Sequence, residues 1–521
     1  MKETINKKVF YSNVVLKRNE LLSETSDIHD YFCKYIPSII LSGNRIMILK
    51  RFSLFVLLFT SFTAAFAQVP VQTEWASRIV YVSSSFNSSG AFSASQLLGK
   101  PNSLSFKNTT SPLAWASKKD GDEATPGQVE VIRVGFKSNI KAIQAAIVEN
   151  YNPGAVIAVI AYSTNGESDT IYSAHAEATG TGDRTLNIFF KNRFDVAELE
   201  IHLHTGKVDG WNQIDAIAIS NLAEPIQSTI NVASTFKNIT PENLGNGVNS
   251  QYEEKAPVIS PDGKTLYFVR KNDPQNIAQT GEDIWVSEIS PGTSSFSKAE
   301  NIGAPLNNNI SNFAGSITPD GTTMLLADAY TNTVNKSAAI ATRTVDGWGA
   351  PQALKIDNFY NRSNLAYYSL STDKKILLMC VERDGGAGNL DIHVSFLKEN
   401  NQWTEPKNIG RDINTAGQEA TIFLAADGTT IFFSSNGHNG YGDNDIFMSR
   451  RLDSTWTHWS EPENLGSNIN TPVWDGYYST DASGARAYFV SENNSLGGND
   501  IFSVKLPPSL QVRPVVLVRG K

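Results

Sequence analysis

Hydrophobic positions in the C-terminal half of the chain come in short runs, and each run follows a polar turn. The clearest example is the turn 260–263, which reads Ser-Pro-Asp-Gly and precedes the apolar run 266–268. Pro261 presets φ, the side chain of Asp262 can bond the local backbone, and Gly263 supplies a φ > 0 position. The pattern therefore predicts a tight turn that leads into a β-strand.

The same turn and strand recur at nearly constant spacing. The turn positions are Asp262, Asp320, Asp373 and Asp427, with Ser483 in the fifth place. Their separation is about 55 residues, and several short strands in a unit of that length are typical of a β-propeller blade. Because these aspartates recur at the same place in the turn, we interpret them as turn residues that bond local N–H groups, in preference to calcium ligands.

Two further landmarks recur in step with the turn. An Asp-Ile-aromatic strand begins at Asp283, Asp391, Asp445 and Asp500, and 338–340 replaces it in the second unit. A segment that starts with an aromatic residue follows at 296–303, 348–354, 403–410 and 459–466, and one more copy, 236–245, precedes the first turn. The fifth unit has no such segment after it. We therefore expect 236–245 to complete the last blade, which predicts a five-bladed propeller over 230–508, closed by overlap of its ends.

The N-terminal part alternates short strand-like runs with turn clusters. Seven or eight such runs between 68 and 225 predict a β-sandwich or jelly roll. The whole chain is therefore expected to be all-β, with a sandwich followed by a propeller. Before the sandwich, a basic segment at 47–51, an apolar run at 52–62 and Ala-Phe-Ala at 65–67 have the layout of a signal peptide. We expect export and a start at Met47, so that 1–46 is not translated; the alternative is that 1–46 is a disordered extension or a long pre-sequence.

Composition narrows the classes of function. A net charge of −8 argues against nucleic acid as a partner. No later segment is long and apolar enough for a transmembrane span. Removing residues 1–67 also removes Cys33, and Cys380 then lies alone in an apolar strand pattern, as expected of a packed thiol. The motifs of serine hydrolases, zinc proteases, P-loop proteins and redox dithiols are absent from the sequence, so we expect no cofactor and no metal.

The repeat resembles a known family. The turn, the apolar strand and the Gly-rich loops at 440–447 and 497–502 are similar to the Pro-Asp propeller repeats of the periplasmic Tol translocation protein, and more similar to those of multidomain OmpA-family proteins of Bacteroidota. Residues 68–225 resemble the galactose-binding-like, discoidin-type jelly rolls found before such propellers. The resemblance implies a scaffold in the periplasm or at the outer membrane.

The chain departs from this family at its end. After 507–508 it runs through a strand-like segment to 521, which resembles the start of a further β domain cut short, and it lacks the OmpA-like domain that tethers relatives to peptidoglycan. That puts peptidoglycan binding in doubt.

Candidate binding residues in the propeller lie eight positions before each turn residue. They are Glu254, Asn312, Leu365 with Asn364 beside it, Glu419 and Asp475. There the chain is expected to enter the innermost strand, near one mouth of the central channel. A ring of carboxylates and amides could bind a cation, a basic peptide or a sugar, and paired carboxylates are what a glycosidase needs. The alternative is that these residues bond neighbouring blades, and we favour that or partner binding over catalysis.

Candidate residues in the jelly roll suit glycan binding. Trp115, Tyr151, Asn152 and Trp211 lie in turn-rich stretches and supply aromatic faces and an amide. The alternative is that Trp75 and Trp211 plug the ends of the sandwich. His202 and His204 alternate along one strand and could hold a metal, but without an evident third ligand an exposed polar strand face is the better interpretation.

Two functions follow. The first is a non-enzymatic cell-envelope protein whose propeller is a scaffold for other envelope proteins, with a glycan-binding jelly roll beside it. The second is a secreted glycosidase or lectin with its site at the propeller mouth.

Overall fold

The computed structural model describes residues 72–508 and 511, apart from 104–108, 119–127, 181, 192, 237, 278, 280, 291, 294 and 328–336. Within this part the chain is all-β, as predicted, and its only helices are short 3-10 turns. The predicted extension 1–46, the signal segment 47–67 and, apart from 511, the predicted terminal segment 509–521 lie outside the described residues, so those predictions stay predictions. In the described part of the chain we find no helix whose length and apolar character suit a membrane crossing.

The first nine strands form two antiparallel sheets. One has the order β1(Thr73–Trp75), β9(Gln213–Ser220), β4(Gln144–Tyr151) and β7(Arg184–Phe189). The other has the order β2(Arg78–Val82), β3(Glu130–Ile140), β8(Val196–Leu203), β5(Val156–Tyr162) and β6(Ser168–Ser173).

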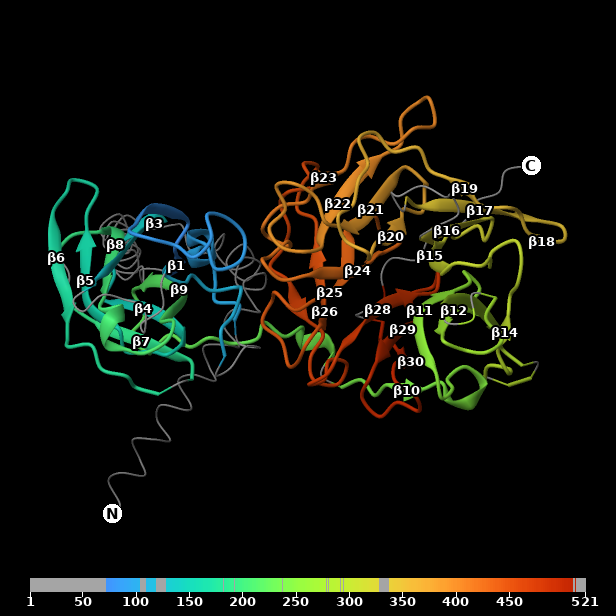
Figure 1. Cartoon of the computed structure of the whole chain (residues 1–521), viewed down its shortest axis with the longest axis horizontal. Helices are drawn as coiled ribbons and strands as arrows, with labels where there is room; N and C mark the ends of the chain where they lie inside the picture. Colours follow the sequence, from blue (N-terminus) through green and yellow to red (C-terminus); the bar gives the residue numbers. More distant parts are fainter. Residues whose placement is uncertain are drawn as a thin grey trace, which may run out of the picture. The chain divides into compact units, whose positions relative to one another are not determined.

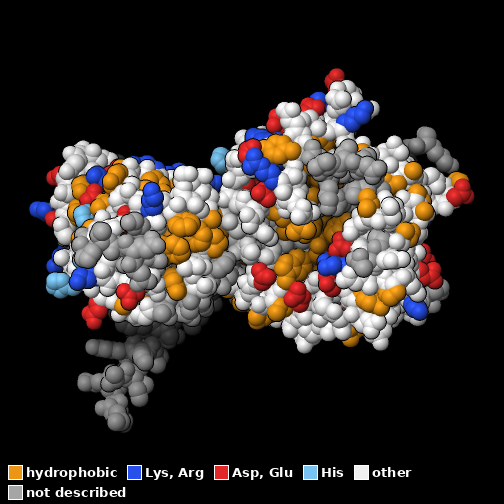
Figure 2. Space-filling view, in the orientation of Figure 1, with side chains coloured by type: hydrophobic (Ala, Val, Ile, Leu, Met, Phe, Trp, Pro, Cys, Tyr) orange, Lys and Arg blue, Asp and Glu red, His pale blue; other side chains and the backbone are white. Residues whose placement is uncertain are grey.

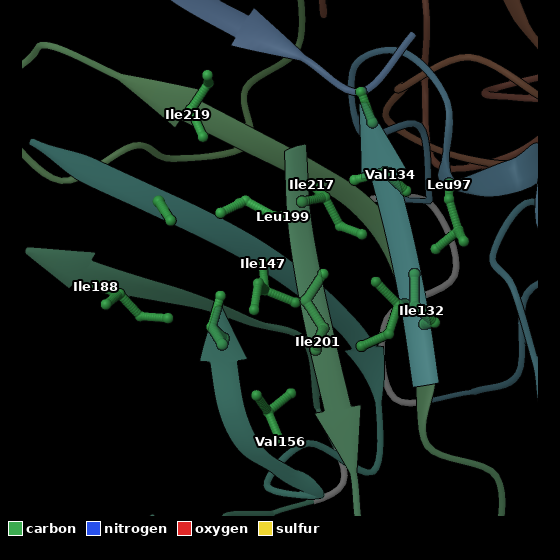
Figure 3. Packing of buried hydrophobic residues seen from close by; sticks show 14 of the residues in the cluster. Leu97, Ile132, Val134, Ile147, Val156, Ile188, Leu199, Ile201, Ile217 and Ile219 are labelled. Atoms are coloured by element: carbon green, nitrogen blue, oxygen red, sulfur yellow. The ribbon is translucent and has the colours of Figure 1, made fainter. Parts of the chain in front are cut away.

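Alternating apolar side chains of both sheets pack into one core, where Ile147 and Ile217 from the first sheet meet Ile132, Leu199 and Ile201 from the second (Figure 3). The two sheets therefore form a β-sandwich.

The remaining strands form five antiparallel sheets. The first sheet contains β11(Glu253–Ile259), β12(Thr265–Lys271), β13(Glu282–Glu288) and β14(Glu300–Asn301), and the second contains β15(Phe313–Ile317), β16(Thr323–Ala327), β17(Ala339–Thr344), β18(Gly347–Trp348) and β19(Gln352–Ala353). The third contains β20(Tyr367–Leu370), β21(Ile376–Val381), β22(Asp391–Phe396) and β23(Lys407–Asn408), and the fourth contains β24(Glu419–Leu424), β25(Thr430–Ser435), β26(Asp445–Arg450) and β27(Glu463–Asn464). The fifth contains β28(Asp475–Thr480), β29(Arg486–Ser491) and β30(Asp500–Lys505). The outer strand of the fifth sheet is β10(Glu242–Asn243), which precedes the first sheet in the chain.

The first strands of the five sheets follow one another around a closed cycle. β11 contacts β15 and β28, β20 contacts β15 and β24, and β24 contacts β28 (Figure 1). Each pair of neighbouring sheets shares an apolar core of its own, such as the one in which Phe268 and Trp285 of the first sheet meet Val490 and Ile501 of the fifth. The sheets are thus joined face to face through side chains, and no sheet packs alone.

Backbone hydrogen bonds also join neighbouring sheets. In four places the N–H at the entry to a first strand donates to a carbonyl at the start of the preceding sheet's third strand, over 2.7–2.8 Å. These bonds are Glu254 to Asn499, Asn312 to Glu282, Glu419 to Leu390 and Asp475 to Asn444. The first of them links the first sheet to the fifth, so it closes the cycle between the two ends of this part of the chain.

The repeated turns have the predicted chemistry. Asp262 Oδ1 accepts the Ser260 hydroxyl at 2.6 Å and the Lys264 N–H at 3.2 Å, and Asp320, Asp373 and Asp427 also accept bonds from within their own turns. Gly263 has φ +70°, which favours glycine. In the third turn Lys374 takes this conformation at φ +62°. The five turns meet around one small cavity of about 50 Å³, so they lie at the same end of their sheets.

Candidate functional site

The predicted positions lie where the chain enters the first strand of each sheet. Glu254 is the second residue of β11, Glu419 and Asp475 begin β24 and β28, and Asn312 immediately precedes β15. All four side chains are completely buried. They therefore lie at the predicted end of each sheet, yet none of them faces solvent.

Each of these four side chains accepts a hydrogen bond from the backbone N–H four residues earlier. The pairs, with N···O distances of 2.6–3.0 Å, are Ser250–Glu254, Asn308–Asn312, Thr415–Glu419 and Thr471–Asp475. In the three acidic cases the hydroxyl of that earlier residue also donates to the carboxylate. The side chains thus hold the loop that leads into the strand, which is a local structural role.

Burial raises the pKa of the three acidic side chains among these four. It raises the pKa of the Glu419 carboxyl to about 8, and the nearby Asp391 carboxylate adds to this shift. It raises the pKa of Asp475 to about 7, and the pKa of Glu254 also lies above its usual range because of burial. Hydrogen bonds from the adjacent hydroxyl and N–H groups oppose the shift in each case.

The third sheet lacks this arrangement. Leu365 and Asn364 precede β20 and are both exposed. The loop is held instead by Asn361, whose amide donates to the Leu365 carbonyl at 2.8 Å. The structure therefore does not bring Asn364 together with the buried acidic side chains.

The first sheet departs from the repeat in another way. The position that faces the third-strand aspartate across the ladder is Arg270 in β12, whereas it is Val381, Ser435 and Ser491 in the third, fourth and fifth sheets. Arg270 Nε donates to Glu254 Oε1 at 2.7 Å, and its guanidinium lies 4.1 Å over the Trp285 ring. A cavity of about 330 Å³ lies beside it.

Sequence reasoning missed a second repeated network, which we call the Asp–Asn–Asn link. In the fourth sheet Asp445 accepts the Asn464 amide, Asn464 accepts the Asn470 amide, and Asn470 bonds both the N–H and the carbonyl of Ile446. Equivalent links join Asp283, Asn301 and Asn307; Asp391, Asn408 and Asn414; and Asp500, Asn243 and Asn249. The sequence does carry a signal for this link, because in all four copies the two asparagines are six residues apart.

The same end of the sheets exposes apolar side chains. They are Ile277, Ile310, Leu365, Tyr441, Val473 and Leu496, which are 36–53% exposed. All six lie in the loops that either precede a first strand or join a second strand to a third, and antiparallel pairing places both kinds of loop at one end. We call these six side chains the apolar loop face. In the view of Figure 2 hydrophobic side chains gather near the middle of the part that forms the five sheets, beside acidic and basic side chains.

The structure separates the four predicted glycan-binding residues of the sandwich. Trp115 is completely buried, and its Nε1 donates to the Ser84 carbonyl at 3.0 Å, so its ring offers no face to a sugar. Tyr151 ends β4 and Asn152 follows it, while Trp211 lies two residues before β9, which pairs with β4 at this end.

Trp211 is half-buried and packs against two phenylalanine rings. Its ring centroid lies 5.1 Å from that of Phe86 and 6.5 Å from that of Phe92. The other tryptophan considered as a plug, Trp75, is also half-buried and packs against Ala146, Ala218 and Ile226.

The paired histidines and the lone cysteine have ordinary surroundings. His202 Nε2 lies 2.8 Å from Glu200 Oε1 on the partly exposed face of β8, and His204 follows the end of that strand. Among the described residues there is no group of three or more His, Cys, Asp or Glu side chains placed to hold a metal ion. Cys380 is completely buried in β21, and burial raises the pKa of its thiol.

Comparison with known proteins gives weak likenesses. No family model matches the chain. No curated protein matches it either. The alpha-L-arabinofuranosidase of Lactobacillus brevis is 12% identical at a TM-score of 0.35, and the match covers 54% of this chain and all of that one (100%).

Two further solved structures show likenesses of the same kind. A leech intramolecular trans-sialidase is 10% identical at a TM-score of 0.29, over 83% of this chain and 98% of that one. Prolyl oligopeptidase B of Galerina marginata is 10% identical at a TM-score of 0.27, over 46% of this chain, which spans only 31% of that protein's length. At such TM-scores these likenesses assign no activity to the chain.

Proposed function

We propose that the chain is a non-enzymatic binding protein of the cell envelope, built on a five-bladed β-propeller that presents the apolar loop face to a partner protein. The cyclic order of the five sheets, their shared cores and the pairing of β10 with β30 support the propeller. The signal-peptide layout and the resemblance to Pro-Asp repeats support export and the envelope.

The apolar loop face is the observation that carries this proposal. Six large apolar side chains gather in the loops at one end of the sheets, whereas the hairpins at the other end expose only Val345 and Leu452 among the described residues. Apolar side chains collected on one surface are typical of protein interaction sites.

The carboxylates at the same end of the sheets give less support to catalysis on glycans. A glycosidase needs two carboxylates that face the substrate. Glu254, Glu419 and Asp475 are instead buried, and their oxygens accept bonds from their own loops. The alternative of a glycosidase at the propeller mouth is therefore not favoured by the geometry of the predicted residues.

The test is capture of partners from an envelope extract with two matched double variants. We expect Ile277→Asp with Leu496→Asp to lose a protein that the unsubstituted chain retains, because both changes place a charge on the apolar loop face. Val345→Asp with Leu452→Asp alters two exposed apolar residues at the opposite end and should retain that protein.

Three results would contradict the proposal. Equal capture by both double variants would show that the apolar loop face is not the binding surface. Binding to a glycan array without any captured protein would favour a lectin. Hydrolysis of a glycan substrate by the purified chain would show an enzyme.

A further inference from the structure

A cavity of about 330 Å³ opens beside β12, next to the one guanidinium that interrupts the repeat. Its lining includes Tyr252, Arg270, Gln275 and Lys298. We propose that this cavity binds a carboxylate-bearing sugar, that is, a hexuronic acid residue. This site is independent of the apolar loop face, because none of the six side chains of that face lines the cavity.

Arg270 supplies a fixed and nearly buried cation. Its Nη2 donates to the Val248 carbonyl at 2.7 Å and its Nη1 to Asp273 Oδ2 at 3.2 Å, in addition to the Nε bond to Glu254. These bonds engage three of the five N–H groups of a guanidinium and leave one on each terminal nitrogen. Two such N–H groups on one planar fork suit the two oxygens of a carboxylate.

Lys298 supplies a second cation at the edge of the cavity. Its side chain is exposed and forms no ion pair with any residue that the structure describes. Because Glu254 and Asp273 already pair with Arg270, Lys298 supplies the uncompensated positive charge that a carboxylate bonded to the Arg270 fork would meet. Asp273 in the same wall makes the site suited to a singly charged ligand, because further negative charge would be repelled.

The rest of the lining suits hydroxyl groups. The side-chain amides of Asn246 and Gln275 make no hydrogen bond within the described residues, and each offers two donors and an acceptor. The Tyr252 hydroxyl accepts one bond, from Gln251, and can still donate. The volume lies at the lower end of the range for small-molecule sites, which fits a single sugar unit. A hexuronic acid combines one carboxylate with several hydroxyls. It therefore matches both the cationic side chains and the amide and hydroxyl groups that line the cavity.

The experiment measures binding of D-glucuronate and D-galacturonate to the full chain by calorimetry, with D-glucose, D-galactose and acetate as comparison ligands. We expect at least one uronate to bind about tenfold more tightly than its neutral sugar, because charge-assisted hydrogen bonds are made only with the carboxylate. Acetate should bind more weakly than the uronate because it lacks the hydroxyls.

Variants then locate the site. Lys298→Gln should weaken uronate binding about fivefold, since it removes a charge near the ligand while leaving the fold unchanged. Lys264→Gln removes an exposed lysine at the turn end of the same sheet and should leave binding unchanged. Gln275→Ala should weaken the uronate and leave acetate unaffected. Arg270→Lys keeps the charge without the fork and should weaken binding more than Lys298→Gln, with thermal unfolding recorded to verify its fold.

Different results would overturn the location of the site, the role of the ligand carboxylate and the role of the sugar hydroxyls. Absence of uronate binding by the unsubstituted chain, or equal loss in Lys298→Gln and Lys264→Gln, would overturn the site. Equal affinity for the uronate and its neutral sugar would overturn the role of the carboxylate. Equal affinity for acetate and the uronate would overturn the sugar.

Discussion

Glu419 shows how one buried side chain can make stability depend on pH. Burial raises its folded-state pKa to about 8, whereas an unperturbed glutamate titrates near 4.5. Between these two values the folded chain binds more protons at this site than the unfolded chain. The free energy of unfolding therefore falls as pH rises through this window, and the site imposes no such penalty below pH 4.5.

Glu419→Gln should remove this dependence. The glutamine oxygen can accept the Thr415 N–H, while its amide can donate to the hydroxyls of Thr415 and Ser435, which now accept. We expect the variant to gain about 3 kcal/mol of unfolding free energy relative to the unsubstituted chain between pH 5 and pH 8. Urea unfolding followed by tryptophan fluorescence at several pH values measures this difference. The matched control is Glu492→Gln, an exposed position, and the same trend there would contradict the assignment to Glu419.

At the scale of the elements, the Asp–Asn–Asn link fastens an outer strand to its sheet. Outer strands such as β27 are only two residues long, so their own ladder bonds are few. Asn470 adds bonds to both backbone groups of Ile446 in β26 and one to Asn464 in β27. The Asn470 side chain thus pairs the Ile446 N–H and adds a second donor to the Ile446 carbonyl, which also accepts the Leu465 N–H at 3.1 Å.

Asn470→Ala should lower the free energy of unfolding by about 2–3 kcal/mol, because it leaves the buried N–H of Ile446 without a partner and removes the bonds that Asn470 donates to the Ile446 carbonyl and to Asn464. Chemical denaturation measures the loss. Asn493→Ala, at an exposed position, should change the free energy by less than about 0.5 kcal/mol. Equal effects of the two substitutions would show that the Asp–Asn–Asn link has no special stabilising role.

At the scale of the whole molecule, the same link joins segments that are far apart in the chain. Asn243 of β10 donates to Asp500 of β30 at 2.7 Å, whereas the equivalent Asn301 bonds Asp283 of the adjacent strand. Each asparagine bonds the third-strand aspartate of its sheet. The first bond joins residues 257 positions apart in the chain, and the second joins residues 18 positions apart. The first therefore closes the cycle of sheets, and the second stabilises only its own sheet.

Asn243→Ala should accelerate hydrogen exchange in β10, β11 and β30 together, because the first and fifth sheets lose a shared fastening. Asn301→Ala should accelerate exchange only in β13 and β14. Peptide-resolved hydrogen exchange distinguishes the two patterns. An effect of Asn243→Ala confined to β10 would show that the cycle is held closed without this bond.

Much of the fold could be predicted because turn chemistry is local. Pro261, Asp262 and Gly263 specify their turn by themselves, and counting such turns gave the number and order of the sheets in the C-terminal part. The site was harder, because burial depends on residues distant in sequence. The position of Glu254 at the entry to its strand followed from spacing, but its pairing with Arg270 and the burial of Trp115 depend on how strands pack, which no local pattern encodes.

The fifth turn has a consequence for how this repeat can change over time. Four turns place an aspartate third, but in the fifth the aspartate is Asp481, in the first place, and the hydroxyl of Ser483 donates to it at 2.7 Å. In the first turn the same two places are bonded in the opposite direction, from Ser260 to Asp262. The first and third places are bonded side chain to side chain in four of the five turns, whereas in the fourth the first place is Ala425 and Asp427 accepts the Thr430 hydroxyl at 2.7 Å. Where the bond is present, its two members can exchange places only if both change. A compensatory pair, Asp481→Ser with Ser483→Asp, should restore the stability that either change alone removes, as chemical denaturation of the two single variants and the double variant would show.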